Sequence, residues 1–149
     1  MAEASVTIDF SQFARASRYA QAKGVQAARM PQYVAPIVYE FMGRVHKAAQ
    51  VYPPPLPKQK YIRTYKLRHS WRMSGVTVSA DEVRGSVYSD GSARSRYGEY
   101  APYVMDAARQ AFIHRGRWHT TKSMAEDVNA PLRRALERRA RQLLETPVT

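Results

Sequence analysis

The residues that could carry acid–base or metal chemistry are few and scattered. The chain has four histidines and no cysteine, which excludes disulfide bridges, thiol nucleophiles and metal sites built on thiolates. His114 and His119 are five residues apart, whereas two histidines that bind zinc from one helix face, as in H-E-x-x-H, are four apart. We therefore predict no metal site, no cofactor and no catalytic residues.

Paired carboxylates and glycine-rich motifs give no stronger sign of an enzyme. Asp81–Glu82 falls in a predicted turn, and Glu126–Asp127 opens a predicted helix, where negative charge favours the helix dipole. The chain has no G-x-S-x-G, P-loop or G-x-G-x-x-G motif, so the hydrolase, NTPase and dinucleotide-binding classes lack their usual support. A small ribonuclease-like enzyme that uses His69, His114 or His119 as acid and base is a minor alternative.

Positive charge is the stronger signal. The chain has 24 Lys and Arg against 12 Asp and Glu, a formal net charge of +12 at pH 7. Residues 58–72 hold six basic residues and no acidic one, with Tyr61, Tyr65 and Trp71 among them. Such a segment is also typical of small basic nucleic-acid-binding modules, which we keep as the alternative function. Against it, these aromatics lie in a proline loop and not at alternating strand positions.

The whole chain fits one domain. Its 149 residues and 44% hydrophobic content are typical of a folded single domain over residues 1–149. We expect flexible ends at about 1–5 and 146–149 and an extended loop at about 52–66. No apolar run approaches the roughly 20 residues that cross a bilayer, and no secretory signal is visible. We therefore expect synthesis in the cytoplasm and no membrane partner.

Hydrophobic spacing predicts helices in the first third of the chain. Asp9 or Ser11 can cap a helix that runs through Ala22. A second helix over about 32–50 has apolar residues three and four positions apart, which we interpret as its core face. Four prolines within residues 53–57 must end it. The apolar residues of the second helix are Val34, Val38, Phe41, Val45 and Ala48.

The middle of the chain is predicted to be a sheet of three or four strands. Residues 67–71 can form one helical turn. Residues 76–87 then predict a β-hairpin with its turn at 80–82, and Gly85 indicates a bulge or close packing. Residues 100–106 predict a further short strand.

A final helix is predicted to begin at Ser123, which forms a capping box with Glu126. Pro131 is expected to kink or restart it. We interpret the arginines on its surface as a solvated face, with contact to an anionic or acidic protein surface as the alternative. The predicted fold class is α+β: N-terminal helices and a C-terminal helix pack on a small, mainly antiparallel sheet, with a long Pro-rich basic loop.

A long linear motif resembles the signature of the neck, or tail-completion, proteins of long-tailed bacteriophages. That signature is a tyrosine, prolines and then Y-[VI]-R-T-x-x-L-x-x-S-W. Tyr65 departs from it, because many relatives place glycine or another small residue there. The matching positions are Tyr52, Pro53, Pro54, Pro55, Tyr61, Ile62, Arg63, Thr64, Leu67, Ser70 and Trp71.

A second stretch, residues 100–120, is similar to a later segment of the same family. There a tyrosine–valine strand is followed by a glutamine, a histidine and an aromatic residue. With the order of helix, motif loop, sheet and C-terminal helix, the resemblance covers most of residues 5–145. The matching positions are Tyr100, Tyr103, Val104, Gln110, His114 and Trp118.

The resemblance implies a structural virion protein and not an enzyme. It further implies that copies of the chain form a ring, expected to be hexameric, in the neck between the head and the tail of the virion. The expected partners are further copies of the chain, a connector or head-completion protein, and the tail terminator or tail tube protein. Genomic DNA would pass through the lumen without sequence specificity. The expected location is the neck of the virion.

The residue types in both segments also suit protein contact. A proline-rich arm is already extended and loses less entropy on docking, and Arg, Tyr and Trp concentrate binding energy at interfaces. For Leu67 and Trp71 we favour anchoring of the loop to the core. The predicted interface residues are Tyr52, Pro53, Pro54, Pro55, Tyr61, Arg63, Lys66, Arg68, Trp71, Arg72, His114, Arg117 and Trp118.

Overall fold

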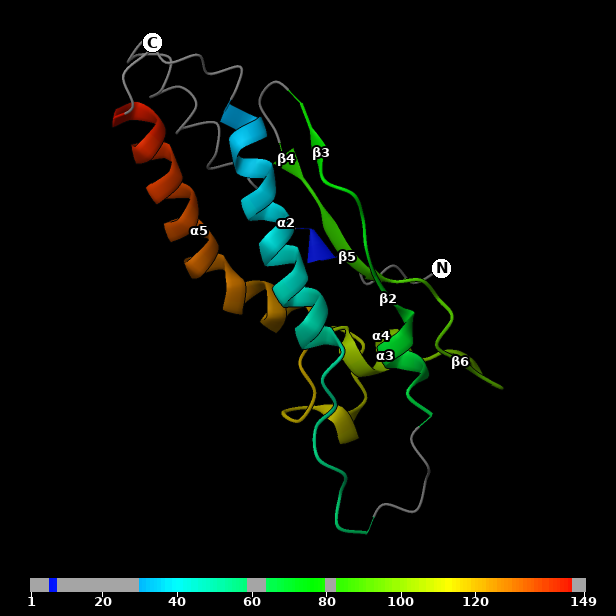
Figure 1. The fold of residues 1–149 in the computed structure, drawn as a ribbon. Helices are drawn as coiled ribbons and strands as arrows, with labels where there is room; N and C mark the ends of the chain where they lie inside the picture. Colours follow the sequence, from blue (N-terminus) through cyan, green and yellow to red (C-terminus); the bar gives the residue numbers. More distant parts are fainter. Residues whose placement is uncertain (1–5, 8–29, 59–63, 80–82, 146–149) are drawn as a thin grey trace.

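Two long helices and a set of short strands make up the protein. The computed structural model describes residues 6–7, 30–58, 64–79 and 83–145. Helix α2 (Met30–Ala49) lies between helix α5 (Thr121–Glu145) and the strands (Figure 1). The shorter helices α3 (Lys66–Ser70) and α4 (Ala101–Met105) lie together beyond the C-terminal end of α2. The predicted helix before Ala22 lies outside the described residues.

The strands are short and antiparallel. The main sheet has the order β1-β5-β2, and its register sets Trp71 opposite Ser89. The pairing of the two predicted hairpin strands is confirmed, since Val78 pairs with Val83, while the predicted turn at residues 80–82 lies outside the described residues. The α+β fold class is therefore confirmed. The strands are β1 (Val6–Thr7), β2 (Trp71–Met73), β3 (Thr77–Val78), β4 (Val83–Arg84), β5 (Ser86–Ser89), β6 (Arg94–Ser95) and β7 (Gly98–Glu99).

Helix α2 follows the prediction from spacing closely. Its predicted apolar face is buried, and Pro36 lies in its first two turns without ending it. The chain leaves the helix after Ala49, before the prolines whose missing N–H groups could not continue the hydrogen-bond ladder. None of the described helices is both long enough and apolar enough to cross a membrane.

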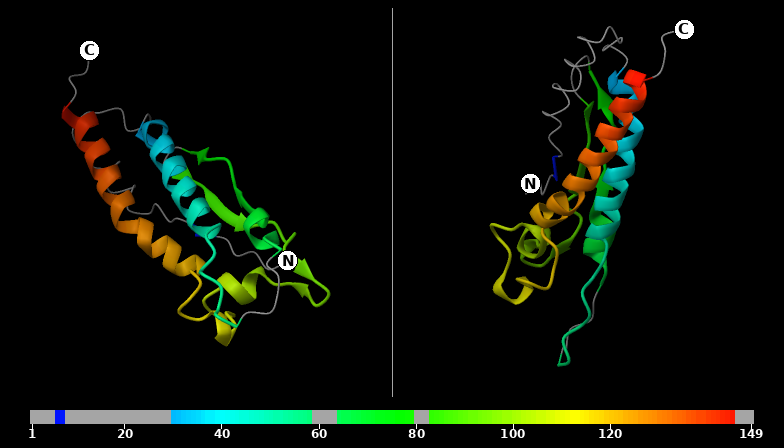
Figure 2. Two further views of the ribbon diagram at one scale, coloured as in Figure 1. Left: turned by 60° about the horizontal axis from the view of Figure 1, so that its bottom comes forward. Right: turned by 90° about the vertical axis from the view of Figure 1, so that its left-hand side faces the viewer.

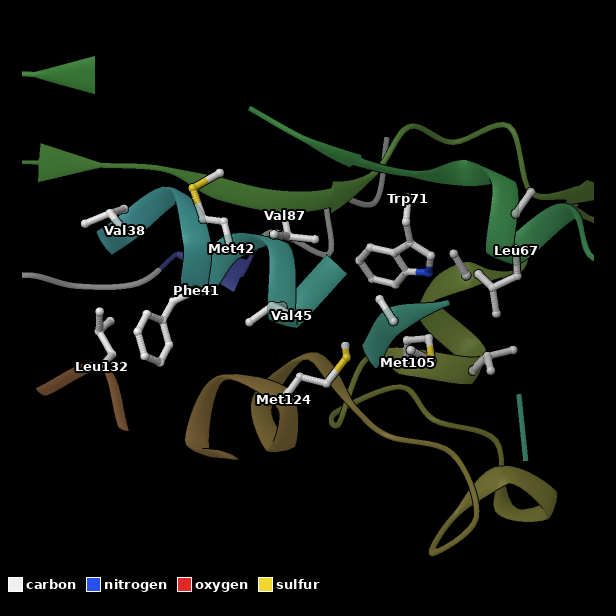
Figure 3. Packing of buried hydrophobic residues seen from close by; sticks show 14 of the residues in the cluster. Val38, Phe41, Met42, Val45, Leu67, Trp71, Val87, Met105, Met124 and Leu132 are labelled. Atoms are coloured by element: carbon white, nitrogen blue, oxygen red, sulfur yellow. The ribbon is translucent and has the colours of Figure 1, made fainter. Parts of the chain in front are cut away.

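One hydrophobic core connects all the elements. It takes side chains from α2, α3, α4, α5 and the sheet. The Trp71 indole lies near its centre, with Val45 and Val87 on one side and Leu67 on the other (Figure 3). Because Trp71 begins β2 directly after α3, this one side chain fixes the end of the helix to the sheet.

Gly85 is a point of close packing, as its isolated position between two strand segments predicts. A Cβ atom added at Gly85 would collide with the sulfur of Met42, which is fully buried in α2. The absence of a side chain therefore lets α2 approach the sheet.

Two local predictions are wrong. Residues 101–105 form helix α4 and not a strand, with Pro102 in the first turn, where proline is well accommodated. The cap of α5 lies earlier than predicted: the Ser123 N–H donates to Thr120 Oγ1 (3.1 Å), and the Thr120 N–H donates to Ser123 Oγ (2.9 Å). The reciprocal pair is thus Thr120 with Ser123. Helix α5 continues through Pro131 without a restart.

Candidate protein-binding surface

Residues 51–58, which we call the proline arm, leave the end of α2 and run away from the body of the molecule (Figure 2). Pro54, Pro55 and Pro57 are exposed, and Leu56 keeps 48% of its surface exposed. Consecutive prolines fix φ and cannot donate to a sheet or helix, so this segment stays extended. It carries an apolar surface outward from the fold.

Residues 106–120, the histidine loop, lie at the same end of the molecule. The buried Gln110 side chain holds the loop, because its Nε2 donates to the carbonyl oxygens of Val104 (2.8 Å) and Trp118 (3.3 Å). The Ala111 N–H also donates to the Tyr103 carbonyl (2.8 Å). The loop contains a single turn of 3-10 helix, η2 (Phe112–His114). These bonds give a loop with little regular structure a fixed position against α4.

The proline arm and the histidine loop meet through aromatic and polar contacts. The Tyr52 ring meets the edge of Trp118 at 4.8 Å between centroids and stacks on Tyr65 at 5.1 Å. Arg117 Nη2 donates to the Pro54 carbonyl (2.8 Å). The two segments that the sequence marks out are thus one surface in space, although Pro54 and Arg117 are 63 positions apart in the chain.

Tyr65 adopts a backbone conformation that side chains rarely take. Its φ of 57° and ψ of 12° are left-handed, and no other non-glycine residue in the described part of the chain has positive φ. This conformation costs roughly 1–2 kcal/mol for a residue with a Cβ atom. A glycine, which has no Cβ atom, would take this conformation without that cost. Here the stacking on Tyr52 offsets part of the cost.

A cleft of about 470 Å³ opens beside the arm, between α3, α4, β6 and the histidine loop. Its floor is apolar and buried, and its walls are largely aromatic. None of the described lining residues carries a carboxylate. The cleft is lined by Tyr52, Thr64, Tyr65, Lys66, Leu67, Arg94, Ser95, Tyr100, Tyr103, Val104, Ile113, His114 and Trp118.

His114 lies at this surface in surroundings that favour its neutral form. Burial lowers its pKa below the usual value, and the nearby Arg117 lowers it further. Its Nδ1 is buried and has no hydrogen-bond partner in the described part of the structure. The imidazole lies edge-on to Trp118, with 5.9 Å between centroids. Its surroundings are those of an aromatic packing residue that lacks the carboxylate partner of a catalytic base.

The structure places most of the predicted interface residues at this surface. Lys66 and Arg68 are exposed in α3. The Arg68 N–H donates to the Tyr52 hydroxyl (3.2 Å). Tyr61 and Arg63 lie outside the described residues. The remaining predicted residues found here are Pro53, Pro54, Pro55, His114, Arg117 and Trp118.

Trp71 and Arg72 have other roles. The Trp71 side chain is 1% exposed, so the alternative of anchoring in the core is the one that the structure shows. Arg72 forms an ion pair with Asp90 (2.9 Å) and donates to the His69 carbonyl (2.7 Å). It therefore holds the start of β2 against the chain that follows β5.

The serine of the motif is also structural. Ser70 is fully buried; its Oγ donates to the Leu67 carbonyl (2.8 Å) and hydrogen-bonds the Ser89 hydroxyl (2.9 Å). A buried hydroxyl with both partners satisfied stabilises the junction between α3 and the sheet. Nothing in this arrangement activates it as a nucleophile.

Sequence reasoning missed several residues of the cleft. Arg94 and Ile113 gave no signal, because only the fold brings β6 and the histidine loop beside α3. Tyr100 and Tyr103 are three residues apart, and this spacing would have put them on one face had the stretch been interpreted as a helix. No group of three His, Asp or Glu side chains that could hold a metal ion occurs among the residues described.

Comparisons with protein-family models, curated proteins and solved structures found no match to this chain.

Proposed function

We propose that this protein is a structural component of the neck of a long-tailed bacteriophage. It forms a ring, hexameric by analogy with the family it resembles, that joins the DNA-filled head to the tail. The ring binds a connector or head-completion protein on one side and the tail terminator or tail tube on the other. The genome passes through its lumen. In this proposal the protein acts by assembly and has no enzymatic activity.

One observation carries the proposal. The proline arm and the histidine loop, which hold the two segments of the resemblance, form a single exposed surface at one end of the molecule. Its aromatic, proline and arginine side chains are of the kind that concentrate binding energy at protein interfaces. A contact between an arm on one copy and a different surface on the next is head-to-tail, and such contacts close into rings when the rotation permits.

Passage of the genome through the ring limits how much positive charge can line the lumen. Each phosphate that a protein neutralises adds salt-sensitive affinity, with a slope of about −0.9 per contact. A lumen lined densely with arginine would therefore retain the DNA that it must release. We infer that most of residues 58–72 face a neighbouring subunit or an acidic partner and not the lumen.

Negative-stain images of the purified protein, alone and mixed with phage tails, test the proposed assembly. We expect closed rings or decorated tail ends. A monomer that binds neither tails nor heads would overturn the proposal. Filter binding to short DNA and RNA at two salt concentrations tests the alternative, because a nucleic-acid module keeps sub-micromolar affinity at physiological salt.

Arg68→Glu tests the role in joining of the surface beside the root of the proline arm. The change reverses an exposed charge without touching the core. In a phage that lacks its own copy and is supplied with the variant, we expect infectious particles to fall at least about tenfold, because reversing an interface charge costs on the order of 1.4 kcal/mol or more. Separate heads and tails should accumulate. Arg141→Glu, an equal charge change on exposed α5, is the matched control; equal yields from both variants would contradict the role.

A further inference from the structure

The cleft beside the arm gathers apolar side chains that the fold leaves exposed. Tyr65, Tyr103 and Ile113 keep 46%, 57% and 63% of their surface exposed, while Leu67 and Val104 beneath them are buried. Contiguous exposed apolar surface of this kind marks interaction sites on soluble proteins. The volume of about 470 Å³ is enough for a few side chains of a partner.

The charged side chains that line the cleft are cationic, although Glu99 lies opposite Arg94 in the register of β6 and β7. Lys66, in the first turn of α3, and Arg94, in β6, are exposed and line it. Neither side chain has an ion-pair partner in the described part of the chain. With no carboxylate among the described lining residues, the cleft is electrostatically complementary to an anionic ligand.

The aromatic side chains favour a polypeptide over a nucleic acid. Bases bind by stacking on open ring faces. Here Tyr65 covers Tyr52 at an interplanar angle of 18°, and Trp118 meets Tyr52 edge-on. The rings therefore pack on one another and form a wall. Two cations at one cleft are also too few to follow a phosphate backbone.

We propose that this cleft binds an extended acidic segment of a different protein. An apolar or proline side chain of that segment enters between Tyr65 and Tyr103, and its carboxylates pair with Lys66 and Arg94. Grooves lined with aromatic side chains are known to accept extended proline-containing peptides. The chain itself has 24 Lys and Arg against 12 Asp and Glu, so an acidic segment of a different protein complements the two cations of the cleft better than a segment of a second copy does. The inference rests on the proposed function in one respect: the partner is a neighbouring protein of the neck or tail.

Fluorescence anisotropy with labelled probes tests this inference on the full chain. The first probe is a dodecapeptide in which Asp and Glu alternate with Leu and Pro. The second replaces each Asp and Glu with Asn and Gln, and the third is an oligothymidylate of matching length. We expect micromolar binding of the acidic peptide and at least about tenfold weaker binding of the other two, a difference of about 1.4 kcal/mol.

Charge reversals locate the binding site. The double variant Lys66→Glu with Arg94→Glu should weaken acidic-peptide binding about tenfold or more, a loss of about 1.4 kcal/mol. The matched control reverses Arg134 and Arg141 on α5, which changes the net charge equally but lies away from the cleft. Because Tyr103 is exposed, Tyr103→Ala should weaken binding of the acidic peptide without unfolding the protein. Circular dichroism checks that the variant is folded.

Several results would overturn the inference. One is an equal loss of affinity for the acidic peptide in both double variants. The others are tighter binding of oligothymidylate than of the acidic peptide, and no binding of any probe. Self-association that Tyr103→Ala abolishes would identify a second copy as the occupant and would likewise overturn it. The peptide assay needs no ring, and the images of rings and tails need no peptide. Failure of this inference and failure of the proposed function are therefore distinguishable.

Discussion

The two halves of the signature motif lie in opposite environments. In the first half, Pro54 and Pro55 of the proline arm are exposed and Tyr52 and Pro53 are half-buried, while residues 61–63 lie outside the described residues. The second half, Leu67, Ser70 and Trp71, is at most 2% exposed and fixes α3 to the sheet. A single linear motif therefore combines a binding element with the anchor that holds it. Substitutions in the two halves should separate stability from binding.

Replacing each tryptophan in turn gives the largest expected contrast. Trp71→Ala removes the centre of the core and should lower the free energy of unfolding by about 3–5 kcal/mol. Trp118→Ala removes a partly exposed ring and its edge contact with Tyr52, and should cost about 1 kcal/mol. Urea denaturation followed by circular dichroism measures both. Equal losses would show that the histidine loop belongs to the core and would remove the contrast.

Two glycines provide a second, smaller contrast. Gly85→Ala forces a Cβ atom onto the buried Met42 and should lower the free energy of unfolding by about 1–3 kcal/mol. Gly75→Ala is the matched control: a Cβ atom there meets nothing within 4 Å, and the backbone φ is not positive. We expect it to be neutral or to stabilise by up to about 1 kcal/mol. A neutral Gly85→Ala would mean that Met42 can move aside.

The smallest expected effects are those of acid. Lowering the pH should reduce the free energy of unfolding through His114 and through Asp90, each in its own pH range. The pKa of His114 is lowered by burial and then by Arg117. As pH falls below the ordinary histidine value of 6.5, the unfolded chain takes up a proton that the folded chain resists, so the free energy of unfolding falls. His114→Gln should remove this dependence.

Asp90, which pairs with Arg72 beside the core anchor, should respond only in stronger acid. Hydrogen bonds from Ser92 lower its pKa, and Arg72 contributes. Its stabilisation is present above the ordinary value of 3.8 and is lost as pH falls through the lowered pKa. Denaturation midpoints between about pH 2 and pH 8 for wild type, His114→Gln and Asp90→Asn measure both ranges. A shift between pH 5 and 7 that survives in His114→Gln would assign the effect to another group.

Much of the fold could be predicted because it follows from local spacing. The apolar residues of α2 repeat with helical period over five turns, a signal that tertiary contacts reinforce. Helix α4 was mistaken for a strand because five apolar residues are too few to separate the two periods. Strand β2 was missed because it follows α3 with no turn residue between them.

The candidate surface could be predicted only in part. The proline arm and Trp118 were identified from their residue types. The cleft was not, because its walls come from segments far apart in the sequence, and Arg94 and Ile113 carry no local mark of their position. Sequence reasoning also could not decide between core and interface for Trp71, since both environments favour the same residue type.

The hydrogen bond between the Tyr52 hydroxyl and the Arg68 N–H has a mechanical consequence. It ties the root of the arm to the first turn of α3, and α3 leads straight into Trp71. A force on the proline arm is therefore transmitted through about one helical turn to Trp71 in the hydrophobic core. In the proposed neck ring, such a short path would let the arm bear load without first unfolding the segment between the arm and the core.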